Sequence, residues 1–421
     1  LRGRLAARPQ ACAALLLVAG LMASGLGHAA PATLFGLDVL SAGDNITQAY
    51  GINAQGHAVG YSGFTQPDAL TTQATFWAGG QSTAQGLQGL AGVGGSSVAT
   101  AINNHNVLVG SQSGRALSWA SVGPGPAYAA PQFLGSVNPG AHSAQAINDA
   151  GSAVGNHVKC LNIDCSSLHY RAWQWDSTDG MRQIGGEFGF ETNVNGINGA
   201  GDVLVASRNL ANERRFEIIA ADGTATAVSL PGLVSTTDLS INNQRAIAGD
   251  RLVVPSEGPA RYEAFVWFEG IEHALAALDP ASGAEANAIN NSGWVVGSSR
   301  LGPGEYAAVF WAGDLVWDLN SLLSDADADL WHLEAAVALS DNGWIAGNGW
   351  YTDPTTSARQ RRGFTLQLNG DFLGGLPPSV GGGGGGTNPV PLPGTLALAL
   401  LGLAAMTARR PSGATPSSVA P

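Results

Sequence analysis

Tryptophan is the residue whose placement in this sequence most directly suggests a binding site. Trp294 and Trp344 occupy the same position in two consecutive copies of a repeat, and Trp317 and Trp350 lie in the same third of the chain. The five other copies carry different residues at this position: His57, Val107, Ser152, Asp202 and Ala246. Because such mixed chemistry is typical of an exposed position, we expect neighbouring indoles to form a platform on which sugar rings stack. The alternative is that these side chains cover a bare strand face and pack against it.

Three aspartates could supply ligands for a metal ion. Asp325, Asp327 and Asp329 alternate along one short segment, a spacing that can present carboxylate oxygens to calcium. Leu330 stands where the turn glycine of a calcium loop belongs, and no bidentate Glu follows at the required spacing. A solvated acidic loop is the simpler interpretation. We therefore expect no cofactor, with calcium left open.

Catalytic motifs are absent from the sequence. It contains no His-Glu-x-x-His, no Gly-x-Ser-x-Gly and no phosphate loop. The eight histidines are scattered, mostly over predicted turns and loops, where solvated side chains are the default. Carboxylates from different repeats could still form a pair that hydrolyses a glycosidic bond, although no single position identifies them. The sequence favours a non-catalytic protein, with a polysaccharide hydrolase or lyase as the alternative.

Seven copies of one unit must position all of these residues. Each copy begins with a small residue, an Ile or Leu, an Asn or Ser and two variable residues before the turn position, and a short apolar run follows. The copies begin at Gly51, Ala101, Ala146, Gly196, Ser240, Ala288 and Ala338. Their spacing is about 48 residues, which is typical of propellers and related arrays.

The start of each copy predicts a tight turn between two strands. The Ile ends the first strand, and the side chain of the following Asn caps the turn. The last turn position requires a positive φ, which suits glycine and asparagine. The residues at this position are Gly56, Asn106, Gly151, Gly201, Arg245, Gly293 and Gly343, so Arg245 is the exception. An aromatic third strand, such as Phe310-Trp311, and a weaker fourth strand complete the unit.

Turn-linked units of this kind predict an all-β fold, a seven-bladed β-propeller over residues 33–375. One four-stranded sheet cannot bury both of its faces, whereas seven sheets arranged radially can. The seventh copy has an uncertain last strand, and residues 35–40 form a strand-like segment before the first copy. We expect this segment to join the seventh blade and close the ring, which removes an exposed edge. The alternatives are an open array of β-meanders or two smaller β domains.

The N-terminal residues 1–29 are typical of a secretory signal peptide. Three arginines precede an apolar run over residues 11–23, and small residues allow signal peptidase to cleave after Ala29. Export places the chain in an oxidising compartment. There, Cys160 and Cys165 predict a small local disulfide, since a metal pair would need further Cys or clustered His.

The C-terminal residues carry a second targeting pattern. A Pro/Gly-rich linker over residues 376–390 includes six consecutive glycines, and the motif Pro391-Leu392-Pro393 follows it. An apolar run over residues 396–406 comes next, shorter than the roughly 17–25 residues of a secure transmembrane helix. The basic pair Arg409-Arg410 ends the pattern.

This order of motif, apolar run and basic pair over residues 391–410 resembles the PEP-CTERM sorting signal of Gram-negative bacteria, with Leu392 where that family usually has Glu. The resemblance implies that an exosortase, a membrane-bound sorting enzyme, is a partner. It also implies a C-terminal helix that is in the membrane transiently or is retained there. Residues 411–421 run on past the arginines, where such proteins usually stop, and we expect them to form a disordered tail. The alternative is an ordinary single-span anchor.

The repeats themselves resemble the HAF repeat family of probable extracellular repeats. The phrases that carry the resemblance are Ala288 to Gly297, which reads Ala-Ile-Asn-Asn-x-Gly-x-Val-Val-Gly, and Ala264 to Trp267, which reads Ala-Phe-x-Trp. The resemblance covers most of residues 35–375. It implies an exported or surface protein and assigns no catalytic residue.

The charge balance excludes one class of partner. The chain has 19 Lys and Arg against 31 Asp and Glu, a net charge of −12, and charged residues make up only 12% of it. Loss of both terminal segments removes five arginines and no acidic residue, which brings the net charge to −17. A nucleic-acid partner needs a basic face and is not expected. A surface this acidic also repels other polyanions unless a divalent cation bridges them.

These features together predict an exported protein at the outer surface, or in the extracellular matrix, of a Gram-negative bacterium. We expect it to bind extracellular polysaccharide or a matrix partner without catalysis. The alternatives are a propeller-type polysaccharide hydrolase or lyase and a structural coat protein.

Overall fold

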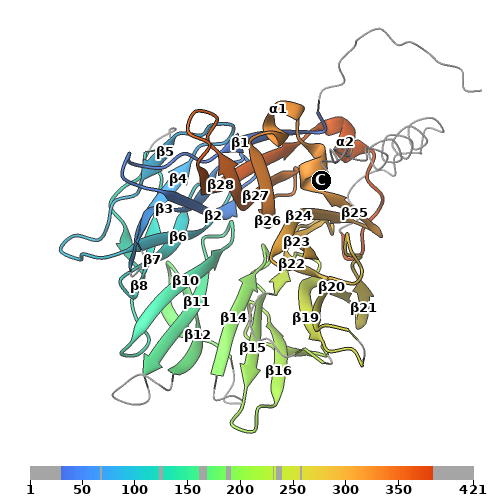
Figure 1. The fold of residues 1–421 in the computed structure, drawn as a ribbon. Helices are drawn as coiled ribbons and strands as arrows, with labels where there is room; N and C mark the ends of the chain where they lie inside the picture. The colour runs from blue at the N-terminus through green and yellow to red at the C-terminus, as the bar shows by residue number, and fades with distance from the viewer. Residues whose placement is uncertain are drawn as a thin grey trace, which may run out of the picture.

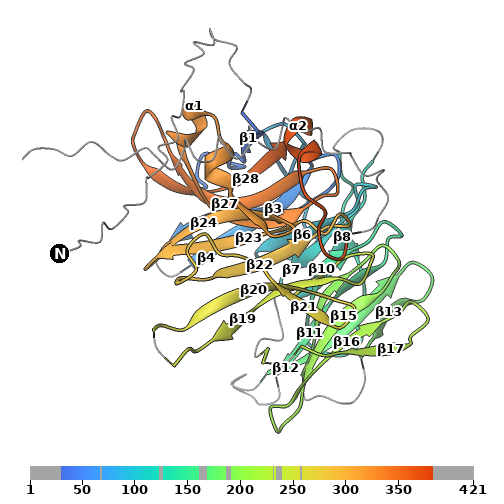
Figure 2. The ribbon, with the colours of Figure 1, turned by 90° about the vertical axis from the view of Figure 1, so that its right-hand side faces the viewer.

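The predicted propeller is confirmed. The structure is a computed structural model that describes residues 30–66, 69–122, 127–160, 168–185, 191–230, 232–233, 239–256 and 258–382. These residues form seven antiparallel sheets of four strands each, arranged around a central axis (Figures 1 and 2). The innermost strand of each blade contacts the innermost strand of the next, and the seventh contacts the first, so the ring is closed.

The strands follow the chain from the axis outward in blades one to six. Blade one is β2 (Ile46–Ile52), β3 (Ala58–Gln66), β4 (Ala69–Trp77) and β5 (Ala84–Gly86); blade two is β6 (Ser97–Ile102), β7 (Leu108–Gln112), β8 (Arg115–Trp119) and β9 (Gln132–Phe133); blade three is β10 (Ala141–Ile147), β11 (Ala153–Cys160), β12 (Leu168–Asp176) and β13 (Gly180–Gln183). Blade four is β14 (Glu191–Ile197), β15 (Val203–Arg208), β16 (Arg214–Ile219) and β17 (Ala225–Val228); blade five is β18 (Ser240–Ile241), β19 (Ile247–Val253), β20 (Arg261–Phe268) and β21 (Ile271–Ala274); blade six is β22 (Ala284–Ile289), β23 (Val295–Gly302), β24 (Glu305–Ala312) and β25 (Leu315–Asp318).

Blade seven combines both ends of the propeller. It consists of β26 (Trp331–Leu339), β27 (Trp344–Thr352), β28 (Arg359–Leu368) and the N-terminal strand β1 (Ala32–Gly36), which pairs antiparallel with β28 (Figure 1). The predicted closure is therefore confirmed, with a strand that begins and ends earlier than residues 35–40. It ends at Gly36 because the chain then crosses to blade one, where the Asp38 N–H donates to the Ser82 carbonyl at 2.9 Å.

The predicted turns also form. In blade one, Asn53 Oδ1 accepts hydrogen bonds from the backbone N–H groups of Gln55 and His57 at 3.1 and 3.0 Å. All seven last turn positions have a positive φ, including Arg245 at 63°. Arg245 keeps this conformation while its guanidinium donates two hydrogen bonds, of 2.8 and 2.9 Å, to the Asp202 carboxylate of blade four.

The same asparagines join each blade to the next. Asn53 Nδ2 donates to the backbone carbonyl of Asn103 at 3.1 Å, and this step repeats around the ring. The further members are Asn103, Asn148, Asn198, Asn242 and Asn290, whose Nδ2 donates to the Ser340 carbonyl. The Ser340 side chain has no amide group. Asn342 of the same turn therefore completes the circle, and its Nδ2 donates to the Ala54 carbonyl at 2.7 Å. We call this circle the asparagine belt; its asparagines up to Asn290 are between 3% and 6% exposed.

The belt distinguishes two faces of the disc. We call one face the turn face: it carries the belt and the turns after the first and third strands of each blade. The face that carries the hairpins between second and third strands, and the connections between blades, is the hairpin face.

A β-bulge recurs in the first strands and explains a recurring glycine. Register shifts occur in β2, β6, β10, β14, β22 and β26. In blade one the shift lies between Ala49 and Gly51, and Gly60 lies opposite on β3, where a Cβ would collide with the Gln48 carbonyl. The bulge turns this carbonyl toward the neighbouring strand, so glycine is required there.

The apolar core lies between neighbouring blades. Phe310 of blade six, for example, packs in one cluster with Leu333, Ile345 and Phe364 of blade seven. Three third-strand tryptophans donate their Nε1–H across to the segment that follows the preceding blade's last strand: Trp77 to Asp38, Trp119 to Gln88 and Trp311 to Ala276. The aromatic phrase of the repeat thus supplies both apolar area and a satisfied polar contact.

Part of the predicted linker packs against the propeller. After α2 (Gly370–Gly374), residues 376–382 cross the turn face from blade six to blade five, and we call them the strap. Leu376 and Val380 join apolar clusters, Ser379 Oγ accepts from the Gly313 N–H at 2.8 Å, and the Gly381 carbonyl accepts from Asn242 Nδ2 of the belt at 2.7 Å. The strap therefore extends the folded unit beyond residue 375.

The terminal signals predicted from the sequence lie outside the described residues. These are the cleavage site at Ala29, Pro391, Leu392, Pro393, Arg409 and Arg410. Within the described part of the chain, no helix is both long enough and apolar enough to cross a membrane.

Removing one belt side chain should destabilise the whole ring. Asn148→Ala deletes the bond to the Asn198 carbonyl, which keeps only its bond from the Gly201 N–H, and leaves the half-buried Ser152 N–H without its acceptor. We expect the free energy of unfolding, measured by urea denaturation, to fall by about 2–4 kcal/mol. The exposed Asn138→Ala is the control, and an equal small effect for both variants would contradict the role of the belt.

The strap depends on glycine at one position. Gly381 has a φ of 70°, and a Cβ there would collide with that of Ala246. Gly381→Ala should therefore release the strap and expose residues 376–382 to limited proteolysis, with a lower Tm. Gly370→Ala, where a Cβ meets open space, is the matched control. Unchanged proteolysis of Gly381→Ala would show that the strap does not depend on this contact.

Candidate functional site

The position after the turn is not exposed, so the expectation that Trp294 and Trp344 face solvent is wrong. None of its seven residues is exposed. Trp344 is 7% exposed, packs against Phe35 with ring centroids 5.9 Å apart, and covers Gly56, the turn glycine of the next blade. Trp294 is half-buried with its ring edge toward Phe310, at 6.0 Å. This position lies where a blade meets its neighbour, so any side chain there is covered whatever its chemistry.

Trp317 also packs within the fold. Its ring lies 5.7 Å from that of Phe310 and 5.5 Å from that of Phe372, which α2 brings onto blade six. Trp294, Trp317 and Trp344 all contribute to apolar clusters between blades. The structure therefore does not bring the four predicted tryptophans together into one surface, and Trp350 stands apart from the rest.

Trp350 is surrounded by charged side chains at the hairpin end of blade seven. It lies opposite His332 on β26 and opposite Arg361 on β28. Its Nε1–H donates to Glu334 Oε1 at 2.7 Å, and Arg361 Nη1 lies 2.6 Å from Glu334 Oε2. The guanidinium carbons of Arg359 and Arg361 are 4.8 and 4.6 Å from the centroid of the indole ring, which is cation–π distance. We call Glu334, Trp350, Arg359 and Arg361 the Trp350 cluster.

The strands explain this arrangement. Arg359 and Arg361 are two residues apart on β28 and so point to the same side of the sheet as Trp350. Glu334 is the unpaired residue at the first register shift of β26, between Leu333 and Ala335, where the bulge redirects its side chain. On the other side of the sheet, Trp331 packs on Tyr351 at 5.3 Å. The sequence reasoning identified Trp350 but missed the arginines, although their alternation two residues apart was a usable signal.

Basic residues are concentrated on the hairpin face. Of the fourteen Lys and Arg residues between 30 and 382, twelve lie in the hairpin half of a second or third strand. These are Arg115, Lys159, Arg171, Arg208, Arg214, Arg215, Arg251, Arg261, Arg300, Arg359, Arg361 and Arg362. The other two, Arg182 and Arg245, lie at the turn face among the carboxylates of Asp149, Asp179, Asp202, Asp222, Glu269, Asp314 and Asp341. The hairpin face therefore carries most of the basic residues, together with carboxylates such as Glu191, Glu263 and Glu334 that pair with some of them.

Exposed apolar side chains also gather at the hairpins. Phe64 and Leu70 lie at the hairpin of blade one, Leu210 at that of blade four, Leu252, Val254 and Tyr262 at that of blade five and Leu301 at that of blade six, with exposures from 36% to 85%. Exposed apolar groups beside arginines are typical of surfaces that bind other molecules. The hairpin face is therefore the candidate binding face.

The three aspartates do not form a calcium site. Asp325 and Asp327 belong to a single helical turn, α1 (Asp325–Ala328), and Asp329 follows it. Ser324 caps this turn, accepting from the Asp327 N–H at 3.2 Å and donating its hydroxyl to the Asp327 carboxylate at 2.7 Å. Among the residues that the structure describes, no three His, Cys, Asp or Glu side chains are placed to hold a metal ion. The acidic run instead favours the N-terminus of a short helix.

The predicted disulfide between Cys160 and Cys165 cannot be placed. Cys160 ends β11, Cys165 lies outside the described residues, and the side chain of Cys160 is likewise not described. The disulfide stays a prediction.

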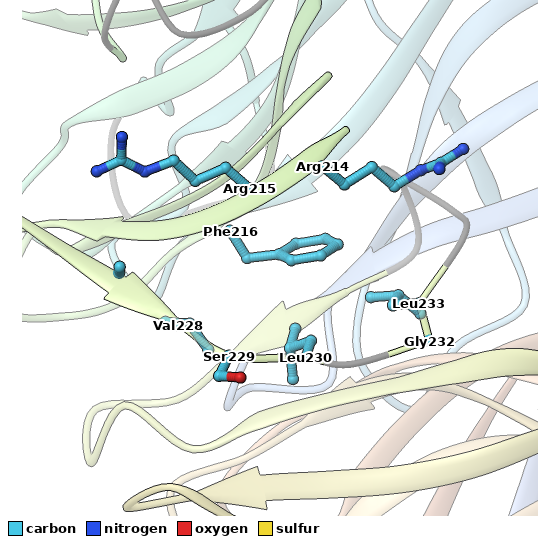
Figure 3. A pocket seen from close by; sticks show the side chains of 9 residues that line it. Arg214, Arg215, Phe216, Val228, Ser229, Leu230, Gly232 and Leu233 are labelled. Atoms are coloured by element: carbon cyan, nitrogen blue, oxygen red, sulfur yellow. The ribbon is translucent and has the colours of Figure 1, made fainter. Parts of the chain in front are cut away.

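Two hollows carry no catalytic arrangement. Figure 3 shows one on blade four, with a volume of about 570 Å³, where Arg214 and Arg215 point in opposite directions above Phe216, Leu230 and Leu233. Its described lining is apolar apart from the two arginines and a serine hydroxyl.

The second hollow, about 240 Å³, is the mouth of the central channel inside the asparagine belt. Its two carboxylates are committed to neighbours: both oxygens of Asp149 accept from Asn104, and both oxygens of Asp341 accept from Asn291. Carboxylates held in this way are poorly placed to act as a general acid and base.

A buried pair of histidines joins two strands of blade three. His142 and His157 lie opposite each other on β10 and β11, are each 2% exposed, and have ring centroids 4.6 Å apart. Each ring donates one N–H to the inter-blade connection: His142 Nδ1 to the Gly140 carbonyl at 3.2 Å, and His157 Nε2 to the Pro139 carbonyl at 3.0 Å. The other ring nitrogens are buried and have no hydrogen-bond partner among the described residues. The expectation of solvated loop histidines is wrong for this pair.

This pair should make stability depend on pH. Burial, and the neighbouring ring of His157, lower the pKa of His142, while the bond to Gly140 opposes them. The unfolded chain therefore binds protons first as the pH falls below about 6.5, and stability is lost in that direction. We expect wild type to lose unfolding free energy more steeply between pH 7.5 and 5.5 than His142→Gln, by at most about 1.4 kcal/mol per pH unit for each proton. His105→Gln, at an exposed turn residue, should keep the wild-type slope; parallel curves for all three proteins would refute the assignment.

Comparison with known proteins agrees with the fold and goes no further. No protein-family model matches the chain, and no curated protein matches it. Among solved structures it is similar to polysaccharide lyase Uly1, at 7% identity and a TM-score of 0.46 over 83% of this chain and 94% of that one. It is also similar to the β-propeller domain of the Trilobed protease from Pyrococcus furiosus, at 8% identity and a TM-score of 0.44 over 77% and 96%. A third is TolB from Acinetobacter baumannii, at 14% identity and a TM-score of 0.36, of whose length this chain spans 60%.

Proposed function

We propose that this protein is a non-catalytic binding module, exported to the outer surface or extracellular matrix of a Gram-negative bacterium, that binds extracellular polysaccharide or a matrix partner. The export signals and the repeat resemblance of the sequence support its location. The observation that carries the binding role is the hairpin face, where arginines and exposed apolar side chains lie beside one another.

The site we assign to this role is the Trp350 cluster with the surrounding hairpins. It holds two guanidinium groups against the Trp350 ring on rigid strands, so that charged donors are kept in place at the surface, where they can orient a polar ligand. The described hollows, by contrast, contain no acid–base pair or metal ligand set. This contrast favours binding over a hydrolase or lyase.

A retention assay tests the proposal. The mature chain, purified from an oxidising host, is passed over the producer's own extracellular polysaccharide, once with calcium and once with chelator, and the polymer length is analysed afterwards. We expect retention without cleavage, and at least a tenfold loss of affinity for Trp350→Ala, equivalent to about 1.4 kcal/mol. Ile271→Ala removes an exposed apolar side chain at the turn-face end of β21, away from the hairpins, and should bind as wild type does.

The other outcomes of this assay each contradict the proposal. Shortened polymer would indicate a hydrolase or lyase. An absence of retention, with self-association of the free protein in solution, would favour a structural coat protein.

A further inference from the structure

The indole of Trp350 is already occupied. Two guanidinium groups lie within 4.8 Å of its ring centroid, and its Nε1–H is bonded to Glu334. A sugar ring stacks on a free aromatic face, so the cluster is poorly suited to neutral sugars. What it presents to a ligand is guanidinium rather than indole.

The cluster also has a surplus of positive charge. Glu334 is the carboxylate that binds Arg361, and its side chain is 15% exposed against 43% for Arg361. Among the described residues Arg359 has no carboxylate partner, and it is exposed. The guanidinium groups of Arg359 and Arg361 are thus held beside one indole ring by its π-electron density and by a single carboxylate. This excess of positive charge lies within a chain whose net charge is −12.

A third arginine raises the local potential further. Arg362 follows on the same strand and points to the other side of the sheet, where its Nη2 donates to Gln360. Its Nη1 is buried and has no hydrogen-bond partner among the described residues. Burial lowers the pKa of Arg362, and the fields of Asp38, Tyr351 and Asp44 oppose this shift. An arginine remains charged at neutral pH in any case, so β28 begins with three cations in four residues.

We propose that the ligand of the Trp350 cluster is an acidic polysaccharide, a polymer of uronic acid residues, whose carboxylates bind Arg359 and Arg361. This inference rests on the proposed function and names its ligand class. The planar guanidinium matches a carboxylate with two parallel hydrogen bonds, and the fork of Arg359 is available for such a pair. Asp353, at the start of the same hairpin, accepts hydrogen bonds from the Thr355 and Thr356 N–H groups at 2.8 and 2.9 Å and forms no ion pair with Arg359.

The test compares one polymer with and without its charge. The mature chain is titrated calorimetrically with polygalacturonate and with the same polymer after methyl esterification, in chelator, so that no divalent cation bridges two acidic partners. We expect the acidic polymer to bind at least tenfold more tightly than the ester, with an affinity that falls as salt is added. Arg359→Gln should lose this preference, and Arg359→Lys should recover part of the affinity, since it restores the charge without the fork.

Arg182→Gln is the matched control, because it removes the same charge from the turn face. Binding of this variant should equal wild type. Three results would overturn the inference: equal binding of acid and ester, no binding of the acid, or equal losses for Arg359→Gln and Arg182→Gln. If the producer's polysaccharide is nevertheless retained as described above, the binding function stands and only the ligand class is wrong.

Discussion

The hydrogen bond from one asparagine amide to the next blade's backbone carbonyl is the contact on which this ring depends. The same side chain also accepts two backbone N–H groups within its own turn, as Asn53 does from Gln55 and His57. One residue therefore shapes a turn and joins it to a neighbour. Because these amides are buried, replacing any of them leaves turn N–H groups without an acceptor and removes the bond to the next blade's carbonyl. The apolar clusters between blades supply the bulk of the burial, but the belt specifies how adjacent blades align.

This alignment separates two chemically different faces. At the turn face, acidic side chains and the strap surround the belt, and the mouth of the channel is lined by groups that bond to one another. At the hairpin face, β-strands end in short hairpins that present arginines and apolar side chains. The Trp350 cluster belongs to the second face, held by three paired strands rather than by a mobile loop. The rigid ring thus holds most of the arginines of an acidic molecule on one face, where they lie among carboxylates such as Glu191, Glu263 and Glu334.

The repeat phrase predicts the seven blades, the turns and the closing strand because the residues of each repeat determine its own strands and turns. The last turn position, for example, has a positive φ even where Arg245 occupies it. The candidate site was harder to predict. Comparison between copies indicated an exposed position for Trp294 and Trp344, but the side chains at this position lie between blades. The sequence of one repeat does not reveal which of its residues the neighbouring blade covers. The bulges and the His142–His157 contact also escaped prediction, since each requires the register of two strands. Trp350 was identified by type, whereas its partners Glu334 and Arg359 come from two different strands and are 25 positions apart in the sequence.

The repeated step of the asparagine belt has a consequence for how such a protein evolves. From blade one to blade six each junction uses the same amide and the same carbonyl, so a whole unit copied or lost within this span meets matching partners on either side. The junction between blades seven and one is different, because Asn342 reaches Ala54 and β1 fills the last strand position. Gene duplication can therefore multiply interior units without new chemistry, while the two terminal units must be inherited together.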